Sequence, residues 1–304
     1  MNNILFGDAV EMLKTMPGEI ANTCVTSPPY YGLRDYGHDG QIGLEETPEE
    51  YINRLVLVFR EVRRVLRDDG TLWVNIGDSY ASNVSNNGGY SDKSTLAGFT
   101  NPNTKGRRAN KNTNKVKINH GCKPKDLIGI PWMLAFALRA DEWYLRQDII
   151  WYKPNPMPES VQDRCTKAHE YIFLLSKSQK YYYDHEAVKE ESVYQPGDRE
   201  DIKKGGFESK YSGDNGRIGD ESFRAMRETR NKRSVWTVST KPYKEAHFAV
   251  FPEKLITPCI KAGSPKGGIV LDPFMGTWTT AEVCKNMGRD FVGCDMSENY
   301  CYWS

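Results

Sequence analysis

The stretch that most constrains this chain is a β-branched run that ends in two consecutive prolines, between Ile20 and Tyr30. Ile20–Val25 has the composition of a buried strand, and the two prolines must end it because neither can donate to a strand ladder. The end of the strand then carries the Ser27 hydroxyl, the proline carbonyls and the ring of Tyr30. Acceptor oxygens beside an aromatic ring suit a planar group with an exocyclic amine. A proline-rich turn without such a role is the alternative.

A second stretch, Gly268–Asp295, predicts a βαβ unit. An apolar strand runs into the glycine-bearing turn Asp272–Gly276, a helix is expected over Thr279–Met287, and a second strand ends at Asp295. In such units the turn commonly binds a nucleoside cofactor and the closing acid binds its ribose hydroxyls. One glycine turn alone would be a weak signal, and the pairing with the first stretch strengthens it.

Together the two stretches resemble the motifs of the DNA amino-methyltransferases, S-P-P-Y for catalysis and D-P-F-x-G-x-G-T-T for S-adenosylmethionine. The catalytic motif comes first, so the order resembles the circularly permuted β group. The resemblance spans nearly the whole chain. It implies an α/β, Rossmann-like methyltransferase fold, circularly permuted, with a mostly parallel sheet and inserted DNA-recognition segments. It also implies S-adenosylmethionine as cofactor and double-stranded DNA as partner.

The resemblance assigns roles residue by residue. For two of the implied cofactor-binding residues another interpretation competes. It is helix capping for Asp8 and core packing for Phe251, in His247–Pro252. The implied catalytic residues are Ser27, Pro28, Pro29 and Tyr30, and the implied cofactor-binding residues are Asp8, Thr26, Phe251, Asp272, Phe274, Gly276, Thr279, Thr280 and Asp295.

One position departs from the family pattern. The cofactor motif has Trp278 where the family usually has a second glycine, which allows backbone angles and a close approach that an indole hinders. Either the loop turns the indole away, or cofactor binding is weakened. In the second case the chain would be a weakly active or inactive DNA-binding relative.

The chemistry expected is direct transfer of a methyl group to an exocyclic nitrogen. In the resembled family S-P-P-Y accompanies N4 of cytosine more often than N6 of adenine, although both amines need the same hydrogen bonds. We therefore expect N4 of cytosine, with N6 of adenine as the alternative. Methylation of cytosine C5 would need a Pro-Cys nucleophile, and Pro258-Cys259 falls inside an expected helix, away from the catalytic edge.

Hydrophobic periodicity predicts the remaining elements. Thr47 is expected to cap a long helix that follows apolar spacing as far as Leu66. Further helices are expected at Trp132–Ala140 and Leu255–Ala262. In the permuted order, Ile4–Phe6 should supply the strand that normally follows the helix after Asp295. Other expected strands are Thr71–Ile76, Tyr144–Trp151, Glu170–Leu175, Ser234–Ser239 and a shorter Lys180–Tyr183, the last forming a hairpin across Ser176–Gln179.

Two segments without apolar periodicity are candidates for DNA contact. Residues 81–121 form a loop in which seven basic residues oppose one acidic residue, a charge suited to phosphate contacts; a disordered insert is the alternative. Residues 185–235 fall where the permuted group carries target recognition, with a solvated insert as the alternative. The implied DNA-binding residues are Arg107, Arg108, Lys111, Arg230 and Arg233. The predicted division is a catalytic part at 1–184, this insert at 185–235, and a cofactor-binding part at 236–304.

Composition sets the remaining expectations. The net charge of 304 residues is only +1, so any basic surface must be local. The seven cysteines are scattered without a Cys-x-x-Cys pair, which indicates reduced thiols in a cytoplasmic protein and predicts no metal site. The resemblance implies that this protein is prokaryotic or phage-encoded. No apolar run reaches membrane length. A cognate restriction endonuclease is a possible partner under the resemblance, and the sequence leaves the oligomeric state open.

Overall fold

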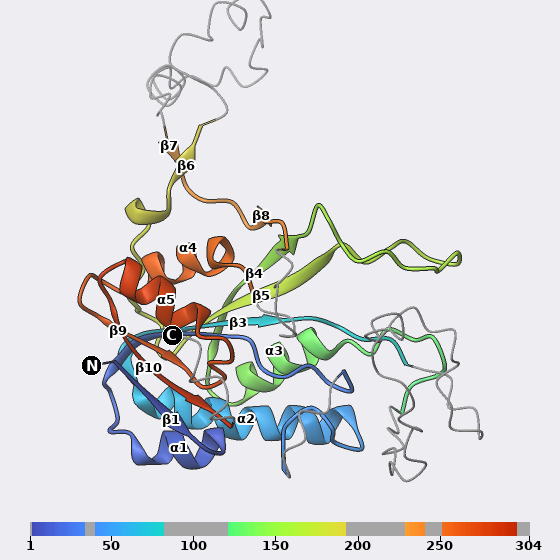
Figure 1. Ribbon diagram of the computed structural model, residues 1–304, viewed down its shortest axis with the longest axis horizontal. Helices are drawn as coiled ribbons and strands as arrows, with labels where there is room; N and C mark the ends of the chain where they lie inside the picture. Colours follow the sequence, from blue (N-terminus) through green and yellow to red (C-terminus); the bar gives the residue numbers. More distant parts are fainter. Residues whose placement is uncertain (1, 34–39, 82–120, 193–228, 241–250, 297–304) are drawn as a thin grey trace, which may run out of the picture.

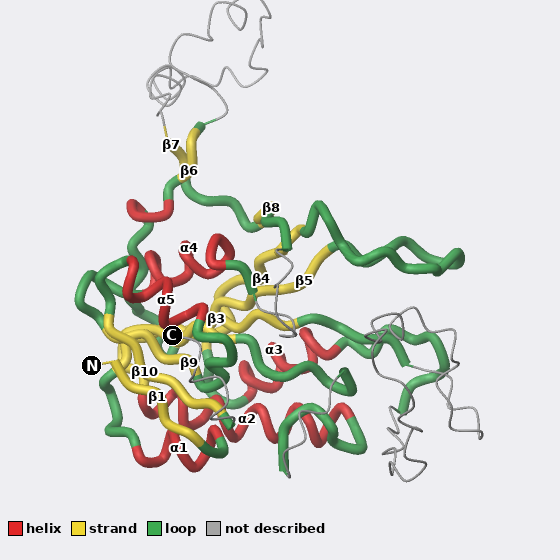
Figure 2. The backbone as a smooth tube through the Cα atoms, in the orientation of Figure 1, coloured by secondary structure: helices red, strands yellow, loops and turns green. Residues whose placement is uncertain are grey.

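The computed structural model describes residues 2–33, 40–81, 121–192, 229–240 and 251–296, and its centre is one eight-stranded sheet between two layers of helices (Figures 1 and 2). The strand order is β1-β10-β9-β2-β3-β5-β4-β8, and only β5 runs against the others. The strands are β1 (Asn2–Phe6), β2 (Ala21–Thr26), β3 (Leu66–Ile76), β4 (Tyr144–Tyr152), β5 (His169–Ser176), β8 (Val235–Thr237), β9 (Ile269–Asp272) and β10 (Asp290–Asp295). This arrangement confirms the Rossmann-like, mostly parallel α/β fold.

The helices divide between the two faces of the sheet. On one face lie α1 (Ala9–Thr15), α2 (Pro48–Val65) and α3 (Ile130–Ala140), and on the other lie α4 (Glu253–Gly263) and α5 (Thr279–Asn286) (Figure 1). Each layer buries its own apolar cluster against the sheet, since a parallel sheet must be covered on both faces. Thr47 caps α2 as expected, accepting from the Glu50 N–H at 3.2 Å.

The two outer strands of the cofactor half confirm the permuted order. β1 pairs in parallel with β10 from Asn2 opposite Phe291 to Phe6 opposite Asp295. β10 continues to β9, which pairs with β2 at Thr23 and Cys24. The strand that opens the chain therefore lies at the edge of a sheet, next to strands from the last third of the sequence (Figure 1).

Two expectations from the sequence need correction. Leu66 ends α2 as its cap and already belongs to β3, so the Asp69-Gly70 turn is part of that strand. Lys180–Tyr183 is not a strand, and the predicted hairpin with β5 is wrong: β5 pairs with β3 and β4 instead. The Tyr182 N–H donates to the Asp69 carbonyl at 2.9 Å, and Tyr183 stacks on Trp73, so packing accounts for these aromatic residues.

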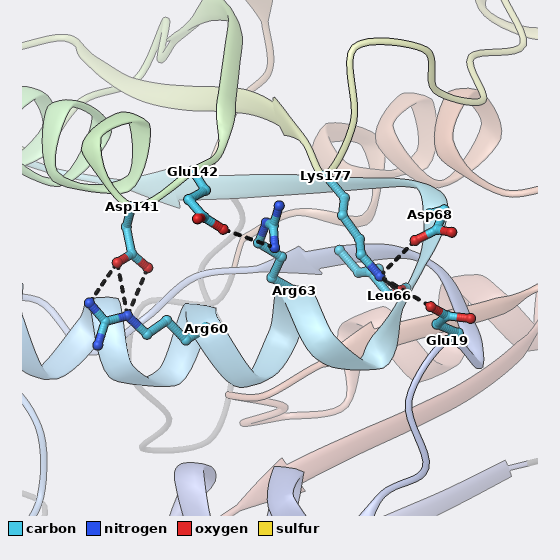
Figure 3. Close-up of polar contacts among 8 residues, drawn as sticks. All are labelled: Glu19, Arg60, Arg63, Leu66, Asp68, Asp141, Glu142 and Lys177. Atoms are coloured by element: carbon cyan, nitrogen blue, oxygen red, sulfur yellow. Dashed lines mark hydrogen bonds and ion pairs between the residues drawn. The ribbon is translucent and has the colours of Figure 1, made fainter.

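The amino-terminal edge of the sheet is held by ion pairs (Figure 3). Arg60 of α2 binds Asp141 at 2.6 Å, and Arg63 lies 3.4 Å from Glu142. Lys177, after β5, donates to the Leu66 carbonyl at 2.8 Å and lies 3.1 Å from Asp68 (Figure 3). The Lys177 ammonium donates to the carbonyl of Leu66, the residue that caps the C-terminal end of α2, where a cation is favoured by the helix dipole.

Several predictions fall outside the described residues. Arg107, Arg108 and Lys111 belong to 82–120, and most of the expected recognition insert belongs to 193–228. The flanks of that insert are described: η2 (Glu186–Val188) is followed by the two-stranded pair β6 (Glu190–Glu191) and β7 (Thr229–Arg230). Within the described ranges no helix is both long and apolar enough to cross a membrane.

Candidate active site

The polar residues singled out from the sequence gather at the carboxyl edge of the sheet. Ser27 follows β2, Gly77 and Asp78 follow β3, and Lys153 follows β4. Glu170 joins them because β5 is antiparallel and so begins at this edge. Asp8 and Asp295 belong to the same edge at β1 and β10. Ligands of open α/β sheets bind at this edge.

Tyr30 is fixed by a network of side chains. Its hydroxyl donates to Glu170 Oε2 at 2.7 Å, and the same oxygen accepts from Asn75 Nδ2 at 3.2 Å. The other carboxylate oxygen of Glu170 accepts from Lys153 Nζ, and the Lys153 ammonium lies 4.2 Å from the centre of the Trp151 ring. Burial raises the pKa of Tyr30 well above its ordinary value, and the neighbouring Glu170 charge raises it further. The phenol is therefore a hydrogen-bond donor at neutral pH.

The backbone around the prolines is equally constrained. The Pro29 carbonyl accepts from the Tyr51 hydroxyl at 2.7 Å, so it is already engaged by α2. A Cβ at Gly77 would lie 2.7 Å from Tyr30 Cε2, which means that the ring packs directly on a glycine backbone. The turn after β2 thus carries both the Ser27 hydroxyl and the Tyr30 ring, and the ring packs against Gly77 at the end of the neighbouring strand β3.

Asp272, at the end of β9, is fully buried and ties the two motifs together. Its Oδ1 accepts from Thr26 Oγ1 at 2.6 Å and from the Phe274 N–H at 3.0 Å. Its Oδ2 accepts from Thr280 Oγ1 at 2.7 Å. Burial raises the pKa of Asp272 to about 6, against the effect of these donors. Thr26, Asp272 and Thr280, predicted as cofactor-binding residues, therefore form a buried support between the catalytic strand and the cofactor loop, and direct contact with a cofactor stays a prediction.

The loop between β9 and α5 has the backbone of a nucleoside-binding turn. Gly276 has φ +52°, and its N–H donates to Asp295 Oδ2 at 2.8 Å. Phe274, Thr279 and Asp295 are partly exposed around this loop. Asp8 caps α1 through one carboxylate oxygen, which accepts from the Val10 and Glu11 N–H groups. Its capping interpretation is confirmed, and its proximity to a cofactor stays a prediction.

Trp278 keeps the backbone conformation that the family pattern gives to glycine. Its φ is +68° and its ψ is +15°, in the left-handed region, immediately before α5. The indole packs against the apolar cluster under α4 and α5, and its Nε1 is buried without a hydrogen-bond partner among the described residues. Phe251 packs against the same cluster. The indole is therefore partly buried against the α4–α5 cluster and is not turned fully out into solvent.

The two described arginines of the expected DNA contact share one acid. Arg230 and Arg233 both donate to Glu190 Oε1, at 2.9 and 2.7 Å. They lie at the foot of the β6–β7 pair, which stands away from the sheet (Figure 1). The Arg233 side chain is two-thirds exposed, whereas that of Arg230 is more enclosed, and DNA contact by either residue stays a prediction.

The residues that sequence reasoning missed are Asn75, Lys153 and Glu170. Each stands at a strand end, but none belongs to a recognised motif, and Glu170 is 140 residues away from the Tyr30 that it binds. The Lys153-Pro154 break after β4 was the available signal, because it marks the same edge of the sheet. Within the described residues no group of three or more His, Cys, Asp or Glu side chains could hold a metal ion.

Comparison with known proteins agrees with this geometry. A DNA methylase family model matches residues 21–304. The chain is 48% identical over 294 residues to the type II methyltransferase M.Cfr9I of Citrobacter freundii, covering 97% of this chain and 83% of that protein. It is 46% identical over 297 residues to M.SmaI of Serratia marcescens, covering 98% and 87%.

Two solved structures share the fold. PvuII DNA methyltransferase, described as cytosine-N4-specific, superposes with a TM-score of 0.62 at 17% identity and covers 98% of this chain and 83% of its own. A putative DNA modification methylase of Thermus thermophilus, solved with S-adenosyl-L-methionine, gives 0.58 at 22% identity, covering 99% and 90%.

Proposed function

The chain belongs to the DNA methylase family that methylates exocyclic amines, and we propose that its target is N4 of cytosine in double-stranded DNA. The observation that carries the proposal is the position of Ser27 and Tyr30, at the end of a strand that Asp272 ties to the cofactor loop. The active site and the cofactor loop are thereby parts of one rigid edge.

S-adenosylmethionine is the methyl donor of this chain, and the residues present fit it. Gly276 and Trp278 both adopt left-handed backbone angles, which open the turn between β9 and α5. Asp295, at the end of β10, presents a partly exposed carboxylate beside that turn, suited to ribose hydroxyls. When bound, this cofactor supplies an electrophilic methyl group on a sulfonium.

The residues of the chain orient the amine. An aromatic amine delocalises its lone pair into the ring, so the nitrogen must be made more tetrahedral before it attacks. The Ser27 hydroxyl and the Pro28 carbonyl are acceptors for the two N–H groups, and the Pro29 carbonyl is occupied by Tyr51. Tyr30 offers a ring on which an extruded base can stack. No strong base is needed, because the positive charge formed on nitrogen makes its proton acidic.

Carbon methylation is disfavoured. The only Pro-Cys pair in the sequence is Pro258-Cys259, and Cys259 is buried in α4 on the helix layer, not at the carboxyl edge. Burial raises the pKa of the Cys259 thiol far above its ordinary value, so it is a poor nucleophile.

Two alternatives differ from the proposal in one respect each. N6 of adenine would use the same acceptors, and the Ser27 hydroxyl favours cytosine only through the family pattern. An inactive DNA-binding relative would require Trp278 to block the cofactor, whereas the packing of its indole into the α4–α5 cluster supports an active enzyme.

The decisive experiment is incubation of the protein with unmethylated DNA and isotopically labelled S-adenosylmethionine, followed by nucleoside mass spectrometry. Labelled N4-methylcytosine is the expected product. N6-methyladenine would correct the base, and DNA binding without transfer would favour the inactive relative.

For the partners we propose duplex DNA and, because the relatives are type II methyltransferases, a restriction endonuclease that reads the same site. Contacts by Arg233 and the basic residues of 81–121 would make DNA affinity fall with salt. We also propose that the chain divides into a catalytic part (1–184), a target-recognition insert (185–235) and a cofactor-binding part (236–304).

A further inference from the structure

Glu170 is the acceptor at the centre of the hydrogen bonds behind the catalytic motif. It receives the Tyr30 hydroxyl, the Asn75 amide and the Lys153 ammonium, while its side chain is only 15% exposed. Lys153 is similarly enclosed, at 18%. A carboxylate with this many charge-assisted and neutral donors is held in one geometry.

The network has a direction. Lys153 can only donate, so it fixes one oxygen of Glu170 as its acceptor. The other oxygen accepts from Tyr30, which consequently must donate its own proton away from the Ser27 side. Because the Tyr30 proton is given to Glu170, it is not available to the Ser27 hydroxyl, and Ser27 Oγ can accept from an incoming amine.

We propose that Glu170 is a positioning residue for methyl transfer: it fixes the Tyr30 ring on which the base stacks, and it keeps the phenol proton away from the Ser27 hydroxyl. The inference rests on the proposed function for its substrate. Glu170 does not touch the reacting atoms, and its effect requires the Tyr30 hydroxyl. Replacing that hydroxyl and replacing Glu170 should therefore damage the same step.

The substitution Glu170→Gln tests the direction of the network. Lys153 holds the amide oxygen of the new side chain, so the amide NH₂ faces Tyr30 and Asn75. Tyr30 must then accept, so its proton is free to turn towards Ser27 and to compete with the amine for one of the two lone pairs of Ser27 Oγ. Tyr30→Phe keeps the ring and removes the link.

The experiment compares wild type, Glu170→Gln, Tyr30→Phe and the double variant for kcat, KM for DNA and calorimetric affinity for S-adenosylmethionine. We expect each single change to lower kcat by about tenfold or more while KM and cofactor affinity stay within about twofold, and the double variant to be no slower than the worse single one. The matched control is Glu159→Gln, the same change in a carboxylate that pairs with Arg164 at 2.6 Å in the same segment, for which we expect an unchanged kcat.

If the kcat losses of the two single variants multiplied in the double variant, the inference would be overturned, because Glu170 would then act independently of Tyr30. A loss confined to KM or cofactor affinity would also overturn it. If the wild type methylates adenine, the proposed base is wrong and the inference is tested unchanged. If the wild type transfers no methyl group, the proposed function fails, and the inference is judged on the urea midpoints of the same four proteins: additive shifts would refute the coupling.

Discussion

Trp278 gives the sharpest test of the structure, because its backbone and its side chain can be perturbed separately. The residue combines a left-handed φ of +68° with an indole packed against the α4–α5 cluster. Trp278→Ala removes the indole but leaves a Cβ in the left-handed conformation. Trp278→Gly removes both. Both variants lose the same packing, so their difference isolates the backbone strain.

The magnitude follows from the left-handed conformation. A Cβ in this region costs about 1–2 kcal/mol relative to glycine, partly offset by the greater freedom of glycine in the unfolded chain. We therefore expect Trp278→Gly to be about 1 kcal/mol more stable than Trp278→Ala, although both are less stable than wild type. Glu142 provides the calibration, because it is exposed, lies far along the chain from the site and has φ +69°. The free energy of unfolding of Glu142→Gly should exceed that of Glu142→Ala by a similar amount.

Urea unfolding of the four variants measures these differences, and calorimetry measures cofactor binding. Because the loop already has the glycine-type backbone, we expect Trp278→Gly to change S-adenosylmethionine affinity by less than about threefold, or about 0.7 kcal/mol. If Trp278→Ala were as stable as Trp278→Gly, the left-handed backbone conformation at residue 278 would be refuted. A rise in affinity of tenfold or more in Trp278→Gly would show that the indole obstructs the cofactor.

Three further predictions concern the site and its supports. Gly77→Ala places a Cβ 2.7 Å from Tyr30 Cε2, and we expect kcat to fall about tenfold with cofactor affinity retained; an unchanged kcat would contradict the packing. Burial raises the pKa of Asp272 from its ordinary 3.8 to about 6, so the fold binds its proton more tightly than the unfolded chain does. The contribution of Asp272 to stability should be complete below about pH 4 and fall by about 3 kcal/mol as the pH rises through 6. The measurement is the difference in unfolding free energy between wild type and Asp272→Asn at each pH. A difference that does not change with pH would refute this prediction. Cys259→Ala should leave the methylated product and kcat unchanged, and loss of transfer would revive a covalent mechanism.

The sequence was sufficient for the elements whose signals are local. Thr47, the periodicity of α2 and the proline stop after β2 act within a few residues, and the structure has each of them as expected. The Lys180–Tyr183 segment failed because its aromatic residues imitate a strand while they pack singly, Tyr183 on Trp73 and Tyr181 beside Arg146. A run of three consecutive tyrosines has the composition of a strand whether or not its rings pack side by side in a sheet.

The candidate site was predictable only as far as its motifs reach. Thr26, Asp272 and Thr280 were identified by resemblance, but their burial in one hydrogen-bonded group depends on strands that meet across the sheet. Glu170 lies within an ordinary apolar strand pattern, and its role exists only because β5 runs antiparallel and begins beside Tyr30. Such contacts between distant segments leave no period in the sequence.

The hydrogen bond between Thr26 and Asp272 also has a consequence for folding during synthesis on the ribosome. The two residues are 246 positions apart in the sequence. At a translation rate of about 5–20 residues per second, β9 is therefore synthesised roughly 10–50 s after β2. During that interval β2 lacks its neighbour β9, and one edge of a strand that is buried in the finished sheet stays open to other chains. Yield of folded enzyme should therefore depend on translation speed, growth temperature and chaperone supply more than the stability of the finished sheet would suggest.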